Sequence, residues 1–297
     1  MAFFLETLFG GLMAGMLYSL VALGFVLIYK ASGVFNFAQG AMVFAAALTV
    51  VGFQEMGAPL WLAVLLALGV MVMLGVLTER FVLRPLVNQP PMTLFMATIG
   101  LTYVIEGLAQ GVWGANVRGL ELGIQDEPIP WLLQAANISV SKFDLFAAGV
   151  AALLVSVLAI FFQYTRIGRA LRAVADDHQA ALSIGIPLQS IWRIVWAVAG
   201  FVALVAGLLW GARNGVSYSL TFTALKALPV LILGGFTSIP GAIIGGLIIG
   251  STEKLAEVYL GQYVGGGIDA WFPYVMALAF LLIRPEGLFG EKHIDRV

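Results

Sequence analysis

The chain has 297 residues, of which 61% are hydrophobic and only 10% are charged, and its mean hydropathy is +1.00. Soluble proteins carry about 25% charged residues, so this composition excludes a soluble surface and indicates a helical membrane protein. The net charge of −1 argues against nucleic acid or another polyanion as a partner. The chain contains no cysteine, which excludes disulfides, thiolate chemistry and cysteine metal sites.

Long uncharged runs follow one another along the chain. They cover residues 7–29, 31–54, 56–78, 85–105, 145–165, 194–212, 227–252 and 270–283. A transmembrane helix needs about 20 apolar residues, so several of these runs suit one crossing each. The first run is long for a signal peptide and lacks a basic segment before it, so we interpret it as a retained span. We expect an all-α, polytopic membrane protein with about 8–9 transmembrane segments in a single permease domain, residues 1–297.

Basic residues predict the orientation in the membrane. They fall into four clusters, around Lys30, Arg80, Arg166 and Arg284. Cytoplasmic loops are enriched in Lys and Arg, and alternating crossings put all four clusters inside if the N-terminus lies outside. Residues 114–142, which are acidic and contain prolines, then form an extracytoplasmic loop, and residues 165–190 form a cytoplasmic loop. The C-terminus is expected in the cytoplasm.

Polar or helix-breaking residues interrupt two of the apolar runs. We expect broken helices near 34–40, where Asn36 and Gln39 occur, and near 229–240, which contains Pro229 and a Gly-Gly pair. Irregular backbone at membrane depth is tolerated only when it is buried in protein or lines a cavity. Asn36 and Gln39 are therefore candidates for the translocation pathway. The favoured interpretation is that they satisfy backbone groups around the break.

Two charged residues lie within apolar sequence, Glu106 and Lys226. Such groups are costly in a membrane and usually face a cavity or an oppositely charged partner. Both are therefore candidates for the translocation pathway, and a structural ion pair is the alternative for each.

Pairs of glycines four residues apart predict close contacts between helices, because they let two backbones approach. These pairs are Gly11/Gly15, Gly107/Gly111, Gly207/Gly211, Gly241/Gly245 and Gly246/Gly250.

The loop at 165–190 predicts two short amphipathic helices. Leu171 and Val174 recur at helical spacing, Asp177 is a plausible N-cap for the second helix, and Gly185 followed by Pro187 ends it. Such a loop could dock a partner protein, or it could be a solvated basic loop that only sets topology.

The same loop resembles the cytoplasmic coupling motif of the branched-chain amino-acid (Liv-type) ABC importer permeases. That motif reads Thr-Arg-x-Gly-Arg-Ala-x-Arg-Ala, followed by an acidic residue and Ala-x-x-x-Gly-Ile. Its residues here are Arg166, Gly168, Arg169, Ala170, Arg172, Ala173, Asp176, Asp177, Ala181 and Gly185. Similar matches occur at 15–24, 36–40, 79–86 and 284–289. The family more often has His at the position of Gln39, which argues against a proton-transfer role there.

The resemblance implies an ABC importer that moves branched-chain or other hydrophobic amino acids, or a related solute such as urea, an amide or an aromatic acid, across a bacterial inner membrane. It implies a second permease subunit that is a paralogue of this chain, two ATPase subunits docked on the coupling loop, and a periplasmic substrate-binding protein. ATP and magnesium would bind to the ATPases, and this chain would hold no cofactor. The sequence lacks a phosphate-binding Gly-x-x-x-x-Gly-Lys-Ser/Thr motif and any His pair suited to a metal, so we expect no catalytic residue.

The main alternative is a secondary transporter driven by an ion gradient. Such a protein needs a set of intramembrane acids or an unwound ion site, whereas Glu106 is the one convincing acid within the spans. That alternative also leaves the basic loop at 165–190 unexplained. An intramembrane enzyme is disfavoured because the spans offer no nucleophile–base pair.

Overall fold

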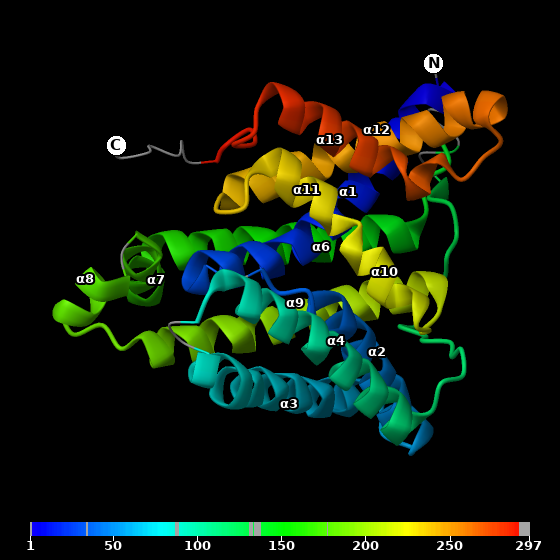
Figure 1. Cartoon of the computed structure of the whole chain (residues 1–297). Coiled ribbons are helices and arrows are strands. Elements are labelled where there is room, and N and C mark those ends of the chain that lie inside the picture. The colour runs from blue at the N-terminus through cyan, green and yellow to red at the C-terminus, as the bar shows by residue number, and fades with distance from the viewer. Residues whose placement is uncertain are drawn as a thin grey trace. The chain divides into compact units, whose positions relative to one another are not determined.

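The computed structural model describes residues 2–33, 35–86, 89–130, 133, 138–176 and 178–290 (Figure 1). Asp177 lies outside the described residues, so the predicted N-cap stays a prediction. In chain order the elements are α1 Ala2–Ser32, α2 Gln39–Glu55, α3 Leu60–Thr78, η1 Glu79–Leu83, η2 Arg84–Leu86, α4 Pro91–Trp113, α6 Lys142–Tyr164, α7 Arg166–Asp176, α8 His178–Ser183, α9 Leu188–Asn214, α10 Ser219–Leu225, α11 Ala227–Gly234, α12 Ile239–Val264, η3 Ile268–Ala270 and α13 Phe272–Ile283. The predicted all-α class is confirmed.

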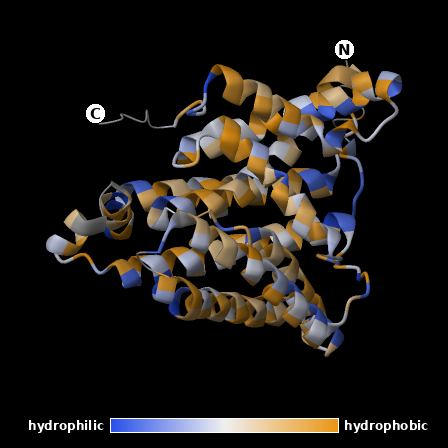
Figure 2. Ribbon diagram, viewed as in Figure 1, coloured by the Kyte–Doolittle hydropathy of each residue, from blue (hydrophilic) through white to orange (hydrophobic). Residues whose placement is uncertain are grey.

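Six helices of the described chain are long and apolar enough to cross a membrane. They are Ala2–Ser32, Leu60–Leu86, Met92–Trp113, Lys142–Tyr164, Leu188–Asn214 and Ile239–Val264. Shorter apolar helices occupy Ser219–Gly234 and Phe272–Ile283. Figure 2 shows hydrophobic residues along most of the helical ribbons, with hydrophilic residues mainly toward helix ends and connections. The chain is a polytopic helical membrane protein, and the total of about 8–9 segments stays a prediction.

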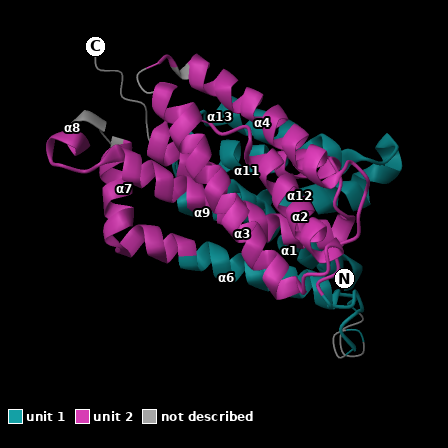
Figure 3. Cartoon of the chain, turned by 90° about the horizontal axis from the view of Figure 1, so that it is seen from below, with its two compact units in different colours: residues 1–22, 123–157, 226–297 teal, residues 23–122, 158–225 magenta. Residues whose placement is uncertain are grey.

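The helices divide into two compact units (Figure 3). Unit 1 consists of residues 1–22, 123–157 and 226–297, and unit 2 of residues 23–122 and 158–225. The boundaries fall within α1, between α4 and α6, within α6, and between α10 and α11.

Helix α2 is the centre of unit 2. It is buried from Gln39 to Gly52 and packs against α3, α4, α9 and α10. Small residues permit this packing: a Cβ at Gly207 of α9 would lie 2.5 Å from the carbonyl oxygen of Val43. A helix surrounded by protein on every side needs no polar face, so α2 is apolar around its whole circumference.

Unit 1 contains a direct backbone contact between the first half of α1 and α12. A Cβ at Gly15 would lie 2.4 Å from the carbonyl oxygen of Gly246, and one at Gly250 would lie 2.4 Å from the amide nitrogen of Gly15. A Cβ at Gly11 would likewise lie 2.7 Å from the carbonyl oxygen of Gly250. The predicted packing role of the pairs Gly11/Gly15 and Gly246/Gly250 is confirmed.

Gly241 and Gly245 pack against α11, where Cβ atoms would lie 2.1 Å and 2.7 Å from the carbonyl oxygens of Gly234 and Val230. The prediction of packing within the chain is wrong for Gly107 and Gly111. Both lie on the exposed face of α4, and a Cβ at either would meet no atom of the described residues within 4 Å.

Both predicted helix breaks are present. The first lies between the end of α1 at Ser32 and the start of α2 at Gln39. The second lies between α11, which ends at Gly234, and α12, which begins at Ile239. Pro229 falls in the first turn of α11, where a missing amide hydrogen costs little, so the helix stops only at Gly235, which has a φ of +103°.

Candidate functional site

The motif at residues 165–186 begins at a tight corner between α6 and α7. The Thr165 hydroxyl accepts a hydrogen bond from the amide of Gly168 at 3.1 Å, so Thr165 caps the N-terminus of α7. The hydroxyl also donates to the carbonyl of Phe161 at 2.6 Å. A Cβ at Gly168 would lie 1.9 Å from the carbonyl oxygen of Phe162. This corner therefore requires a residue without a side chain at position 168.

The arginines of the motif hold α7 against the end of α6. Arg169 donates to the carbonyl of Tyr164 at 3.2 Å, and Arg172 donates to the carbonyl of Gln163 at 3.1 Å. The last carbonyls of a helix have no partner within the helix and carry partial negative charge, so two guanidinium groups there are favourable. The described contacts give these arginines a role in bracing the corner.

Helices α7 and α8 have the predicted amphipathic character. Leu171 and Val174 are fully buried, whereas Arg166 is exposed. Ala170 and Ala173 are partly exposed, and Asp176 is the last residue of α7.

Helix α8 ends in an exposed apolar tip. Gly185, with a φ of +83°, ends it, and the amide of Ile186 bonds to the carbonyl of Ala181 at 3.0 Å. Ala181 is only 1% exposed, whereas Leu182 and Ile184 are 54% and 73% exposed. Ala181 is therefore buried within the protein, and Leu182 and Ile184 are the side chains presented outward.

Side chains of unit 2 form hydrogen bonds with the backbone at the first helix break. Asn36 and Gln39 are both fully buried. The side-chain oxygen Oδ1 of Asn36 accepts a hydrogen bond from the backbone amide of Ala38 at 3.1 Å. The side-chain nitrogen Nδ2 of Asn36 donates to Oε1 of Gln39 at 3.4 Å. Gln39 donates to the carbonyl of Ala199 in α9 at 3.3 Å. These contacts support the interpretation that both side chains form hydrogen bonds with backbone groups around the helix break.

Thr98 of α4 also forms hydrogen bonds with the backbone at this break. Its fully buried hydroxyl accepts from the amide of Phe37 at 3.3 Å and lies 3.1 Å from the carbonyl oxygen of Phe35. A Cβ at Gly24 would lie 2.4 Å from the Gln39 amide nitrogen, so Gly24 makes room for that side chain.

Glu106 lies in α4 of unit 2 and is only 4% exposed. Its Oε1 atom has no hydrogen-bond partner among the described residues. The buried Thr221 hydroxyl of α10 lies beside this carboxyl group and has no other hydrogen-bond partner among the described residues. The structural ion pair considered for Glu106 is absent from the described residues.

Lys226 belongs to unit 1 and pairs with two acids. Its Nζ atom lies 3.3 Å from Glu253 of α12 and 2.9 Å from Asp269 of η3. The Tyr18 hydroxyl of α1 donates to Glu253 at 3.1 Å. These contacts support the structural role for Lys226. Asn36, Gln39 and Glu106 share unit 2, and Lys226 is in the other unit.

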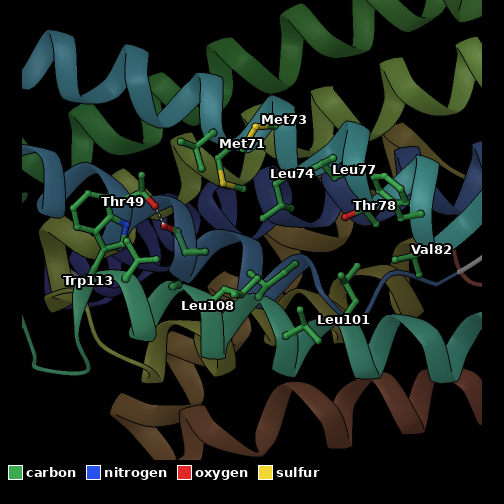
Figure 4. Close-up of a pocket in the computed structure, with 17 residues that line it drawn as sticks. Thr49, Met71, Met73, Leu74, Leu77, Thr78, Val82, Leu101, Leu108 and Trp113 are labelled. Carbon is green, nitrogen blue, oxygen red and sulfur yellow. Dashed lines mark hydrogen bonds between the residues drawn. The ribbon is translucent and has the colours of Figure 1, made fainter.

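An apolar groove of about 490 Å³ runs between α2, α3 and α4 (Figure 4). Its lining includes Met71, Leu77, Leu108 and Trp113. The lining contains no charged residue, and the Thr49 hydroxyl is engaged with the carbonyl of Ala45 at 2.7 Å. A groove of this chemistry suits hydrocarbon and cannot bind the charged groups of an amino acid.

The family described as branched-chain amino acid transport system permease component matches residues 7–284. The chain belongs to this family. The permease is 29% identical to the high-affinity branched-chain amino acid transport system permease protein LivH of Salmonella typhimurium over 320 residues, which cover 99% of this chain and 98% of LivH. It is 24% identical to the fructose import permease protein FruF of Bifidobacterium longum over 246 residues, 80% of this chain and 66% of FruF. Among solved structures it is similar in fold to PsaBC from Streptococcus pneumoniae in complex with Fab, with a TM-score of 0.50, 13% identity, and coverage of 92% of this chain and 89% of that chain.

The described residues of the motif at 165–186 lie together in unit 2 of the permease, on α7, α8 and the turn that follows α8. Sequence reasoning missed Leu182 and Ile184, because the motif emphasises the residues that shape the corner. The sequence could have indicated them. Two large apolar residues flank the polar Ser183 just before Gly185, in a loop that is expected to lie in water. Thr98 was also missed, because a threonine in an apolar helix gives no sign of its distant partner.

Proposed function

We propose that the permease is the transmembrane subunit of an ATP-driven importer for branched-chain or other hydrophobic amino acids, or a related small solute such as urea, an amide or an aromatic acid. Family membership supports the transport role, and the similarity to LivH supports the substrate class. This chain carries the pathway, and ATP hydrolysis takes place on separate subunits.

The observation that carries the proposal is the braced corner at the start of the coupling loop. Thr165, Gly168 and Arg172 tie α7 to the last turn of α6 through hydrogen bonds and direct backbone contact. A displacement applied to α7 and α8 is thereby transmitted to a membrane-spanning helix. The exposed side chains of Leu182 and Ile184 provide an apolar surface on which an ATPase subunit can press.

The proposed complex contains this permease, a paralogous second permease, two ATPases and a periplasmic binding protein. It lies in a bacterial inner membrane, with the N-terminus outside and the C-terminus in the cytoplasm. Substrate released by the binding protein enters from the outside. ATP binding and hydrolysis then switch the permease pair between outward-open and inward-open states.

The test is reconstitution of the permease in liposomes with its paralogue and candidate ATPases, together with binding protein loaded with L-leucine. We expect the loaded binding protein to stimulate ATP hydrolysis and to drive leucine uptake. A proton ionophore should leave this uptake intact. Uptake that requires an ion gradient and not ATP would contradict the proposal and favour a secondary transporter.

A further inference from the structure

One buried acid of unit 2 is left without a counter-charge by the contacts described above. Glu106 is 4% exposed, and no Lys, Arg or His among the described residues forms an ion pair with it. Thr221, 3% exposed, places its hydroxyl beside this carboxyl group and has no other hydrogen-bond partner among the described residues. An unsatisfied buried polar group costs about 1–3 kcal/mol, and more if it is charged. A buried carboxyl group whose one described polar neighbour is this hydroxyl indicates a site that is completed by a ligand.

Aromatic rings lie beside this carboxyl group. The negative charge of Glu106 is the largest cause of a raised pKa of the Tyr218 phenol, followed by burial and by Tyr103, so both tyrosines lie within electrostatic reach of the site. Tyr218 packs edge-to-face against Phe222, with ring centroids 5.2 Å apart, and against Phe44 at 6.4 Å. Tyr103, Tyr218 and Phe222 are 67%, 43% and 55% exposed. The aromatic residues are therefore accessible while the carboxyl group is buried.

The chemistry of the group that fits can be argued from these parts. An ammonium group carries three donors and a positive charge, which match a carboxylate, a hydroxyl oxygen and the faces of tyrosine rings. A calcium or magnesium ion needs about six oxygen ligands, which a single carboxylate and a hydroxyl do not provide. A neutral sugar offers hydroxyl donors but leaves the buried charge uncompensated.

We propose that Glu106 and Thr221, with the rings of Tyr103 and Tyr218, bind the α-ammonium group of the transported amino acid. This inference rests on the proposed function and narrows its substrates to solutes that carry a cationic nitrogen. Glu106 lies seven residues before the end of α4 at Trp113, about 10 Å along the helix axis. Tyr218 follows the backbone bridge between Val216 and Arg118. The site therefore belongs to the half of unit 2 near residues 114–122, which the proposed orientation puts on the entry side.

Carbodiimide labelling of the complete transporter in lipid nanodiscs tests the site directly. Dicyclohexylcarbodiimide modifies buried carboxyl groups, and peptide mass spectrometry reports the rate at Glu106. We expect isoamylamine and L-leucine to slow this labelling about tenfold when present at about ten times their Kd. The deaminated counterpart 4-methylpentanoate should have no effect. Glu253, which is 7% exposed and already paired with Lys226, is the matched control, and no probe should change its labelling.

Three results would overturn the inference. One is equal protection by the amine and by the acid, and another is no protection by either. The third is a Glu106 that is unreactive in the complex but reactive in the isolated permease, because a cation from a neighbouring subunit would then occupy the site.

Transport by variants supplies an independent measurement. Glu106→Gln keeps the shape of the side chain and removes its charge, and we expect it to insert and to be at least as stable as the wild type while lowering leucine uptake about tenfold or more. Glu106→Asp should recover part of the uptake. Wild-type uptake by Glu106→Gln would contradict the inference. If isoamylamine protects Glu106 in a complex that takes up no leucine, the proposed substrate fails and the ammonium site stands.

Discussion

Among the residues in the apolar spans, Glu253 shows how a buried acid is stabilised by its neighbours. It accepts from Tyr18 and pairs with Lys226, which also reaches Asp269. Removing one partner of a buried pair leaves an uncompensated charge, whereas removing both can be nearly neutral.

We therefore predict that Lys226→Met lowers the unfolding free energy by about 3 kcal/mol. The double variant Lys226→Met/Glu253→Gln should recover most of the loss. Thermal unfolding of the purified permease in detergent measures both. Equal losses in the single and double variants would show that Lys226 stabilises the fold by some means other than this pair.

The glycine contact between α1 and α12 leaves no room for a larger side chain. In Gly250→Ala, the new methyl group would lie 2.4 Å from the amide nitrogen of Gly15, so the helices must separate. We expect a loss of about 1–3 kcal/mol of stability, seen as a lower midpoint of thermal unfolding.

Gly107→Ala is the matched control for this substitution, because a Cβ there meets nothing within 4 Å. Alanine is the better helix former, so this variant should unfold at the wild-type temperature or slightly above it. If the two variants are equally stable, the described contact between α1 and α12 is not formed in the folded permease.

At the scale of elements, α7 and α8 separate into a braced corner and an exposed tip. Leu182→Asp and Ile184→Asp should each weaken co-purification of the ATPases about tenfold or more, since buried apolar anchors at interfaces cost about 2 kcal/mol when lost. Thermal unfolding of these variants should match the wild type, because both side chains are exposed in the free permease.

Two further variants test whether Leu182 and Ile184 form the contact surface and whether Ala181 has only a packing role. Gln189→Asp adds the same charge at an exposed position beyond the tip and should leave ATPase binding unchanged. Ala181→Leu enlarges a side chain that is 1% exposed, so its first effect should be a lower unfolding temperature. Full ATPase binding by both aspartate variants would exclude the tip as the contact surface.

For the whole molecule, the absence of cysteine allows topology to be read without background. A cysteine at Gln125 should react with an impermeant maleimide in intact cells, because the loop at 114–142 is predicted outside. A cysteine at Ile184 should react only after permeabilisation. Reaction at Ile184 from outside would reverse the orientation and remove the coupling role of the loop.

Composition and periodicity predicted the helical class, both helix breaks and the two short helices of the loop, because each depends on local sequence. The partners of side chains could not be predicted in the same way. Lys226 meets Glu253 and Asp269 only through the packing of distant segments, and the exposure of Gly107 depends on which face of α4 the other helices cover. The charge patterns of Lys226 and Glu106 look alike in sequence, yet one is paired and the other has no ion-pair partner among the described residues.

The separation of corner and tip has a consequence for engineering transporters. The described bonds that fix α7 to α6 involve residues 161–172, whereas the outward apolar side chains are at 182 and 184. Residues 182–184 can therefore be replaced by those of another permease without altering the bonds that hold α7 to α6. If the exposed side chains bind an ATPase subunit as proposed, such a chimera would change which ATPase binds and leave the transported solute unchanged.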